Sequence, residues 1–203
     1  MKVGLFGGSF DPIHRGHIEP VREARRLLGL ERVIYLPTAT PPHKPRRALA
    51  PAHRRYAMVE LALLDEEGLY VSAHELTPDR PAYTVETLEH FRREMPDSEL
   101  HLLIGGDSFA DFHHWVRWPE IAAAARLVVL ARPGWDLDAV PLDPGVAALV
   151  RTDRVLVLRQ PAVDVSSTRL REQLAAGLPV SAGAAGAVPD LVLRYVQKYG
   201  LYR

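Results

Sequence analysis

The sequence lacks cysteine altogether and contains little lysine. Without cysteine, the chain can form no disulfide bond, no thiolate metal site and no cysteine nucleophile. Its 25 basic residues are nearly all arginine, and lysine occurs only at Lys2, Lys44 and Lys198. A lysine that falls inside a motif is therefore a residue to weigh for function.

An excess of charge of either sign is absent as well, and so is any long hydrophobic run. Lys plus Arg and Asp plus Glu both total 25, which gives a formal net charge of zero. This balance argues against a broad basic face for nucleic acid, although it leaves room for a local basic pocket. No apolar run reaches the length of a membrane span, and no apolar signal region precedes the strand-like start at Val3. We expect a cytoplasmic protein whose partners are small molecules, not nucleic acid or a membrane.

Short apolar runs alternate with segments of helical spacing from one end of the chain to the other. The apolar runs predict strands over residues 3–6, 32–37, 70–73, 99–104, 126–131 and 155–158. The spaced segments predict helices over residues 14–28, 52–64, 84–94, 119–125, 167–176 and 189–199. Such alternation predicts the α/β class, with a Rossmann-like, doubly wound parallel sheet that helices cover on both faces. We expect one domain over residues 1–203, with a small helical extension over about 166–203.

Ligands of such sheets bind at the carboxyl ends of the strands, and the unusual residues of this sequence are found there. Gly7, Gly8 and Ser9 follow the first strand, where glycine lets backbone N–H groups approach a phosphate closely. Their spacing is that of neither a dinucleotide fingerprint nor a P-loop. Taken alone, these glycines indicate a tight turn.

Two histidines stand at the start of the helix that follows. His14 and His17 are three residues apart, so their imidazoles share a face near the positive end of the helix. Such a pair is more often two unrelated histidines, and no third ligand completes a zinc site, so we expect no bound metal. The pair gains weight from its neighbours, because the glycines and Asp11-Pro12 lie at the same strand–helix junction.

The whole segment from Gly7 to His17 resembles the G-[TS]-F-D-x-x-H-x-G-H signature of the nucleotidyltransferase superfamily. Other segments are similar to motifs of the bacterial nicotinate-mononucleotide adenylyltransferases, and together they extend along the whole chain. They are Pro41–Lys44 (PPHK), Pro81–Leu88 (PAYTVETL), Ile104–Ser108 (IGGDS), Trp115 with Trp118, Arg132–Gly134 (RPG), Val165–Arg171 (VSSTRLR) and Tyr199–Tyr202 (YGLY). Val165 and Leu170 stand where the family has isoleucine, which is a mild change. A phosphopantetheine adenylyltransferase would be shorter and would usually carry threonine in place of His14.

The resemblance implies transfer of the adenylyl group of ATP to nicotinate mononucleotide, which gives deamido-NAD and pyrophosphate. The nucleophile would be the 5′-phosphate of the mononucleotide, already an anion at neutral pH, so no general base is needed. The task of the protein is then to align the phosphates and to stabilise their charge. Mg²⁺ is expected to arrive on ATP, because no carboxylate cluster looks like a dedicated cage.

Two alternatives remain open at this point. One is the same chemistry on nicotinamide mononucleotide, which differs by an amide in place of the carboxylate. The other is a non-catalytic nucleotide sensor, which would be expected to lack His14, His17 or Arg171; all three are present. The oligomeric state cannot be read from the sequence, and a homo-oligomer is compatible with it.

The resemblance also implies roles for individual residues. The catalytic residues would be His14, His17, Lys44 and Arg171, with His17 at the α-phosphate. The ATP-binding residues would be Gly7, Gly8, Ser9, Phe10, His14, His17, Gly105, Asp107, Ser167, Thr168 and Arg171. The residues that bind nicotinate mononucleotide would be His43, Lys44, Tyr83, Thr84, Trp115 and Arg132.

Several of these roles compete with simpler interpretations. Thr168 and Arg171 share a helix face, where they would bind the β- and γ-phosphates; otherwise Ser166 or Ser167 caps the helix and Arg171 is solvated. Lys44 would reach phosphate when its proline-rich loop closes, or it is a solvated loop charge.

The remaining roles have alternatives of the same kind. Asp107 would bind a ribose hydroxyl, or it is a turn residue. Trp115 would stack on the pyridine ring beside Tyr83 and Thr84, although two tryptophans three residues apart more often pack in a core. Arg132 would clamp the phosphate of the mononucleotide. We interpret four further arginines as a solvated basic rim, namely Arg46, Arg47, Arg54 and Arg55.

Overall fold

The computed structural model describes residues 1–39, 49–77, 82–159, 163, 165–180 and 186–203. In these ranges one parallel sheet is formed by β1 (Lys2–Gly8), β2 (Arg32–Pro37), β3 (Leu69–Val71), β4 (Glu99–Gly105), β5 (Arg126–Ala131) and β6 (Val155–Arg159). The strands lie in the order β3-β2-β1-β4-β5-β6, so the chain builds one half outward from β1 and then crosses to build the other. This order confirms the predicted Rossmann-like, doubly wound sheet.

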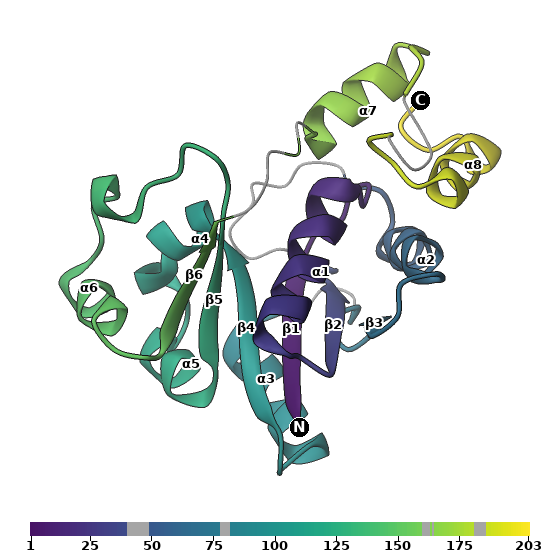
Figure 1. The fold of residues 1–203 in the computed structure, drawn as a ribbon. Helices are drawn as coiled ribbons and strands as arrows, with labels where there is room; N and C mark the ends of the chain where they lie inside the picture. Colours follow the sequence, from purple (N-terminus) through teal and green to yellow (C-terminus); the bar gives the residue numbers. More distant parts are fainter. Residues whose placement is uncertain (40–48, 78–81, 160–162, 164, 181–185) are drawn as a thin grey trace.

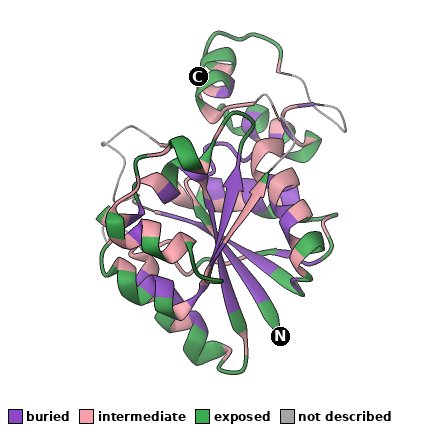
Figure 2. Cartoon of the chain, turned by 60° about the vertical axis from the view of Figure 1, so that its left-hand side comes forward, coloured by how far each residue is buried: buried purple, intermediate pink, exposed green. Residues whose placement is uncertain are grey.

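The strands are apolar on both sides because helices cover both faces of the sheet. Along β4, Leu100, Leu102 and Ile104 face one hydrophobic core, whereas Leu103 faces the other. This period of two within a continuous apolar run is typical of a buried parallel strand. Figure 2 shows the strands as the buried centre of the molecule.

Each face of the sheet has its own set of helices. One core lies beneath α1 (Arg15–Leu28), α2 (Ala52–Leu63) and α8 (Asp190–Tyr199). The other lies beneath α3 (Thr84–Glu94), α5 (Trp118–Ala124) and α6 (Pro144–Val150). Figure 1 shows α1 in front of the sheet and α3 behind it.

The predicted helix boundaries agree with the structure to within two residues. α1 begins at Arg15, with His14 as its N-cap, and ends at Gly29, whose φ of 62° places it in the left-handed region. Glycine reaches that conformation without the steric penalty of a Cβ, which explains the predicted C-terminal cap. β3 starts one residue earlier than predicted and ends at Val71.

Four short helices were not predicted: α4 (Gly106–Ala110), η1 (Phe112–His114), η2 (Leu137–Ala139) and α6. The first three are too short for a period of 3.6 residues to show in the sequence. α6 does carry a readable signal, because Asp143 caps it by accepting hydrogen bonds from the N–H groups of Gly145 and Val146, with Pro144 at its first position.

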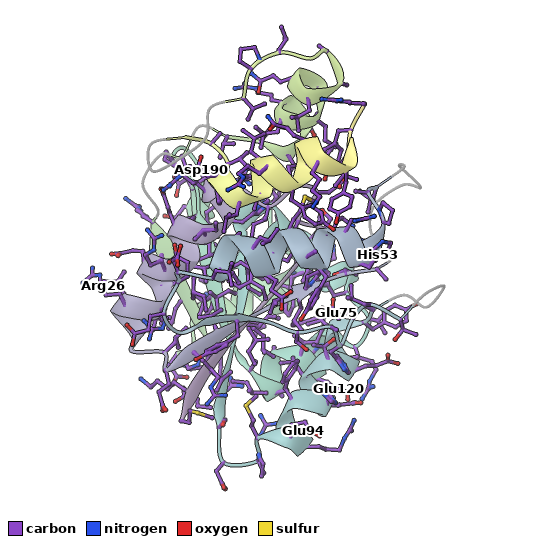
Figure 3. The ribbon with its side chains drawn as sticks, turned by 90° about the vertical axis from the view of Figure 1, so that its right-hand side faces the viewer. Arg26, His53, Glu75, Glu94, Glu120 and Asp190 are labelled. Carbon is purple, nitrogen blue, oxygen red and sulfur yellow. The ribbon has the colours of Figure 1, made fainter. Side chains whose placement is uncertain are left out.

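The C-terminal helices pack against the N-terminal half of the chain. α7 (Ser167–Ala175) lies beyond the carboxyl ends of the strands, and α8 lies alongside α2 (Figures 1 and 3). Val192 and Val196 of α8 share one core with Met58 of α2, and Leu170 of α7 belongs to the same core. In the described residues, no helix is long and apolar enough to cross a membrane.

Candidate active site

A cavity of about 1080 Å³ opens at the carboxyl ends of β1 and β4, where the strand order reverses. In open α/β sheets this switch point is where ligands bind. The cavity is as large as the pockets that hold cofactors and extended small molecules. The predicted site residues that line it are Gly7, Gly8, Ser9, Phe10, His17, Tyr83, Thr84, Gly105, Asp107, Trp115 and Arg132.

β1 extends through Gly8, two residues further than predicted, so Gly7 and Gly8 are its last residues and pair with β2. Together with Ser9 they form the glycine turn, which packs against the ring of Phe10. An added Cβ would meet nothing within 4 Å at Gly7, but at Gly8 it would lie 2.9 Å from Cζ of Phe10. Phe10 has a φ of 46° and its side chain is buried against Phe6 and Tyr35. Its backbone thus belongs to the cavity wall, whereas its ring holds the turn in shape.

The two histidines lie face to face. The imidazoles of His14 and His17 stack with centroids 3.8 Å apart and an angle of 22° between their planes. His17 lines the cavity and also meets the ring of Phe10 edge-on at 5.3 Å, whereas His14 is 2% exposed and lies behind it. An added Cβ on Gly16 would lie 3.0 Å from Cε1 of His14, so glycine between the histidines lets the inner ring pack against the backbone.

Burial controls the charge of the inner histidine. It lowers the pKa of His14 to about 4, and the positive charge of Arg132 acts in the same direction. His14 is therefore neutral at pH 7, so only one of its ring nitrogens carries a proton that it can donate, and the other can only accept. The effect of Arg132 also shows that this cavity-lining guanidinium lies near the histidine pair.

The start of α7 is tied to the turn that follows β1. Ser166 is the N-cap and accepts a hydrogen bond from the N–H of Arg169, as one of the two interpretations predicted. Ser167 donates to the carbonyl oxygen of Pro12 at 3.2 Å. Arg171 donates to the carbonyl oxygen of Asp11 at 2.5 Å and to Oγ1 of Thr168 at 3.2 Å.

These contacts hold the start of α7 beside the cavity. Arg171 is not solvated, because its side chain is only 17% exposed and lies 3.7 Å from the Asp11 carboxylate. Ser167, Thr168 and Arg171 are not among the residues that line the cavity, whereas Ser166 and Arg169 are. The predicted phosphate-binding residues of α7 therefore lie next to the site, but they do not line the cavity.

The structure separates the two tryptophans of the Trp115/Trp118 pair. Trp115 lines the cavity while its ring lies 5.5 Å from that of Phe112. Trp118 is partly buried and packs against the core, where an added Cβ on Gly145 would lie 2.9 Å from its ring. Trp115 thus lines the cavity, whereas Trp118 does not and packs against the core.

A third tryptophan lines the cavity and was missed in the sequence. Trp135 covers the backbone of Gly106, where an added Cβ would lie 2.5 Å from the indole. It follows the Arg132–Gly134 turn directly, so its proximity to that motif was the available signal. Glu75 is a second missed residue of the cavity wall, and it had no recognisable motif of its own.

The interpretation of Arg55 as part of a solvated rim is wrong. Arg55 is 1% exposed and donates three hydrogen bonds to backbone carbonyl oxygens: Nε to Ala50 at 2.9 Å, Nη1 to Ser9 at 2.7 Å and Nη2 to Ala39 at 3.2 Å. Arg54 is half-buried, with its guanidinium 3.9 Å from the centre of the Tyr199 ring. The physical reason is that Arg55 lies where the segments after β1, after β2 and before α2 meet, and one carbonyl group of each segment needs a donor.

Some predicted residues cannot be placed. His43 and Lys44 lie outside the described residues, as do Arg46 and Arg47. Within the described residues, no group of three or more histidine, aspartate or glutamate side chains is arranged to hold a metal ion.

Comparison with known proteins identifies the family. A model described as cytidylyltransferase-like matches residues 5–173. The chain belongs to the cytidylyltransferase-like family. This result confirms the superfamily that the motifs predicted.

Curated relatives within the cytidylyltransferase-like family resemble the chain over its whole length. A probable nicotinate-nucleotide adenylyltransferase of Thermus thermophilus is 40% identical over 203 residues, which cover 100% of both chains. The protein of the same name from Clostridium tetani is 34% identical over 202 residues, covering 100% of this chain and 99% of that one. The narrower resemblance predicted from the later motifs is thereby confirmed.

Solved structures show the same fold. A Plasmodium falciparum nicotinic acid mononucleotide adenylyltransferase complexed with APC superposes with a TM-score of 0.75 at 16% identity, covering 99% of this chain and 96% of the other. The same protein complexed with NaAD gives a TM-score of 0.73 at 16% identity, with 99% and 97% covered. At this identity the likeness concerns the fold of the cytidylyltransferase-like chain.

Proposed function

We propose that this protein transfers the adenylyl group of ATP to nicotinate mononucleotide, forming deamido-NAD and releasing pyrophosphate in NAD biosynthesis. The observation that carries the proposal is the stacked His14–His17 pair at the carboxyl end of β1, beside a cavity of about 1080 Å³. Full-length relatives named for this activity support it, among them the Thermus thermophilus protein at 40% identity.

The reaction is a direct in-line displacement at phosphorus. An oxygen of the mononucleotide 5′-phosphate forms a bond to the α-phosphorus of ATP. The bond from that phosphorus to the bridging oxygen breaks, and its electron pair leaves with pyrophosphate. The attacking phosphate is already anionic, so the residues align the reactants and offset negative charge instead of removing a proton.

In this proposal the two phosphates meet beside the histidine pair and Arg132. His17 faces the cavity and would donate a hydrogen bond to the α-phosphate, with His14 stacked behind it. Arg132 would neutralise the phosphate of the mononucleotide close to the same pair. The backbone from Gly7 to Ser9 and the positive N-terminus of α1 would favour the ATP phosphates.

The other predicted roles follow from where their residues lie. Asp107 would accept a hydrogen bond from a ribose hydroxyl, and Trp115 would stack on the pyridine ring. Tyr83 and Thr84 would receive the ring carboxylate at the start of α3, which no side chain caps. At α7, Arg171 would bind the β- and γ-phosphates once it exchanges its bond to Asp11 for phosphate oxygens.

A divalent cation fits this site as part of the nucleotide. Among the described residues, no cluster of side chains could bind the ion by itself. Mg²⁺ would therefore be held by ATP oxygens and water, where it would offset charge on the leaving pyrophosphate. The roles of His43 and Lys44 stay predictions from the sequence, as do the single domain, the cytoplasmic location and the lack of nucleic-acid partners.

The test supplies ATP and Mg²⁺ with either nicotinate or nicotinamide mononucleotide and measures pyrophosphate and dinucleotide. We expect turnover with nicotinate mononucleotide, and we expect His17→Ala to lose at least about a hundredfold in kcat, as for loss of one charge-stabilising donor. His53→Ala is the matched control, because His53 is exposed at the start of α2 (Figure 3). A clear preference for the amide substrate, or activity of His17→Ala within a few-fold of wild type, would contradict the proposal.

A further inference from the structure

Glu75 is a partly buried carboxylate in the cavity wall. It follows β3, lines the cavity and is labelled in Figure 3. Burial raises the pKa of Glu75, and the hydrogen bonds from Thr38 and Thr87 lower it. Among the described residues, no ion-pair partner of this carboxylate is found. Withdrawing a carboxylate from water costs free energy, so the residues that bind this carboxylate indicate its role.

Each oxygen of the carboxylate accepts a hydrogen bond from a different element. Thr38, directly after β2, donates its hydroxyl to Oε2 at 2.7 Å. Thr87, in the first turn of α3, donates its hydroxyl to Oε1 at 2.8 Å. The backbone carbonyl of Glu75 also accepts from the N–H of Ala39 at 2.9 Å. One residue therefore joins the end of β2, the segment after β3 and the start of α3.

The contact with Thr87 ties the first turn of α3, which has no side-chain cap, to a residue outside the helix. Tyr83, the N-cap of α3, makes no side-chain capping bond. Thr87 lies one turn beyond Tyr83 and Thr84, and all three line the cavity. Without the carboxylate, the nearest acceptor for the Thr87 hydroxyl is the carbonyl oxygen of Tyr83, at 3.5 Å.

We propose that Glu75 is a positioning residue for the pyridine mononucleotide. Through Thr87 and Thr38 it holds the first turn of α3 against the end of β2, and so holds Tyr83 and Thr84 at the distance that the pyridine ring and its carboxylate require. In this role Glu75 acts through the two threonines, each of which donates one hydrogen bond to its carboxylate, and not by contact with the substrate. This inference rests on the proposed function, since it assigns the pyridine subsite of that reaction.

The role predicts a split between the two substrates. In Glu75→Ala and in Thr87→Val, we expect KM for nicotinate mononucleotide to rise about tenfold, because a small displacement of binding groups has effects of at least this size. KM for ATP should stay within about twofold, because the glycine turn and the histidine pair are held by other contacts. A purely structural brace would not distinguish the two substrates.

Two further variants make the test specific. Thr87→Ser keeps the hydroxyl and should keep the wild-type KM, whereas Thr87→Val keeps the shape and loses the donor. Glu94→Ala removes an exposed carboxylate at the other end of α3 (Figure 3) and should leave both KM values unchanged. The two Thr87 variants also decide the question if Glu75→Ala fails to fold.

The outcomes separate this inference from the proposed function. If wild type turns over nicotinate mononucleotide and Thr87→Val raises only the mononucleotide KM, the inference holds. If both KM values rise together, or if Thr87→Ser behaves like Thr87→Val, the positioning role is refuted while the proposed function stands. If wild type uses neither pyridine mononucleotide, the proposed function fails and this assignment fails with it.

Discussion

Replacing Arg55 by methionine should destabilise the protein strongly, although its neighbour Arg54 should tolerate the same change. Methionine keeps the unbranched stem of the side chain but removes all three donors. The carbonyl oxygens of Ser9, Ala39 and Ala50 would then lack their partner in a place where Arg55 is 1% exposed. Burial prevents water from replacing those bonds without rearrangement.

The magnitude follows from the buried hydrogen bonds that methionine cannot make. Removing one partner of a buried charged network costs about 3–5 kcal/mol, which is a large share of a typical folding free energy. In a chain of this length the melting temperature should fall by roughly 6–20 °C. Arg54→Met removes a cation–π interaction of 3.9 Å with Tyr199 and a hydrogen bond to the hydroxyl of Tyr195, but both lie at the surface, so this change should cost much less.

Urea unfolding of wild type, Arg55→Met and Arg54→Met at pH 7 measures both effects by one method. The two substitutions are chemically identical and one residue apart, so differences in the unfolded state largely cancel. A loss below about 1 kcal/mol for Arg55→Met, or equal losses at both positions, would refute the bracing role of Arg55.

Two further predictions concern the site. The pKa of about 4 for His14, below its ordinary 6.5, means that the unfolded chain binds more protons between these values, so stability should fall as pH drops from 6.5 to 4. Across this pH range the free energy of unfolding should fall by about 3 kcal/mol, as measured by urea unfolding at several pH values. In His14→Asn this fall should be missing, and an equally steep pH dependence in that variant would contradict the prediction. Gly106→Ala should cost about 1–3 kcal/mol and displace Trp135, since the new Cβ would lie 2.5 Å from the indole. Gly105→Ala has nothing within 4 Å of its Cβ and is the control, so equal melting temperatures for the two variants would exclude the clash.

The fold could be predicted because its evidence is local. Strands and helices are visible in the periodicity of the sequence, and their alternation leaves little choice except a parallel sheet with crossovers. The position of the site followed, because ligands of such sheets bind at strand ends, where Gly7, Gly105 and Arg132 were visible. α4 could not be predicted, because a helix of five residues is too short to show helical periodicity in the sequence.

The contacts that shape the site could not be predicted in this way. Arg55 and its sequence neighbour Arg54 are both arginines on one helix, yet only Arg55 donates to the carbonyl oxygens of Ser9, Ala39 and Ala50. Glu75 looks like any surface carboxylate until Thr38 and Thr87, 37 and 12 residues away, are seen to meet it. Such pairings arise from tertiary packing, which a local window of sequence does not contain.

Asp11 lies within the Gly7–His17 motif, yet its role also depends on tertiary packing. Its carboxylate is 1% exposed and does not line the cavity. Instead, Oδ1 accepts hydrogen bonds from the hydroxyl of Tyr202 at 2.7 Å and from the N–H of Ala50 at 3.2 Å. Together with the bond from Arg171 to its carbonyl oxygen, these contacts anchor α7 and the C-terminus to the turn after β1. If phosphate draws Arg171 away, Tyr202 and Ala50 still hold Asp11, so the turn can keep its shape while α7 responds to the nucleotide.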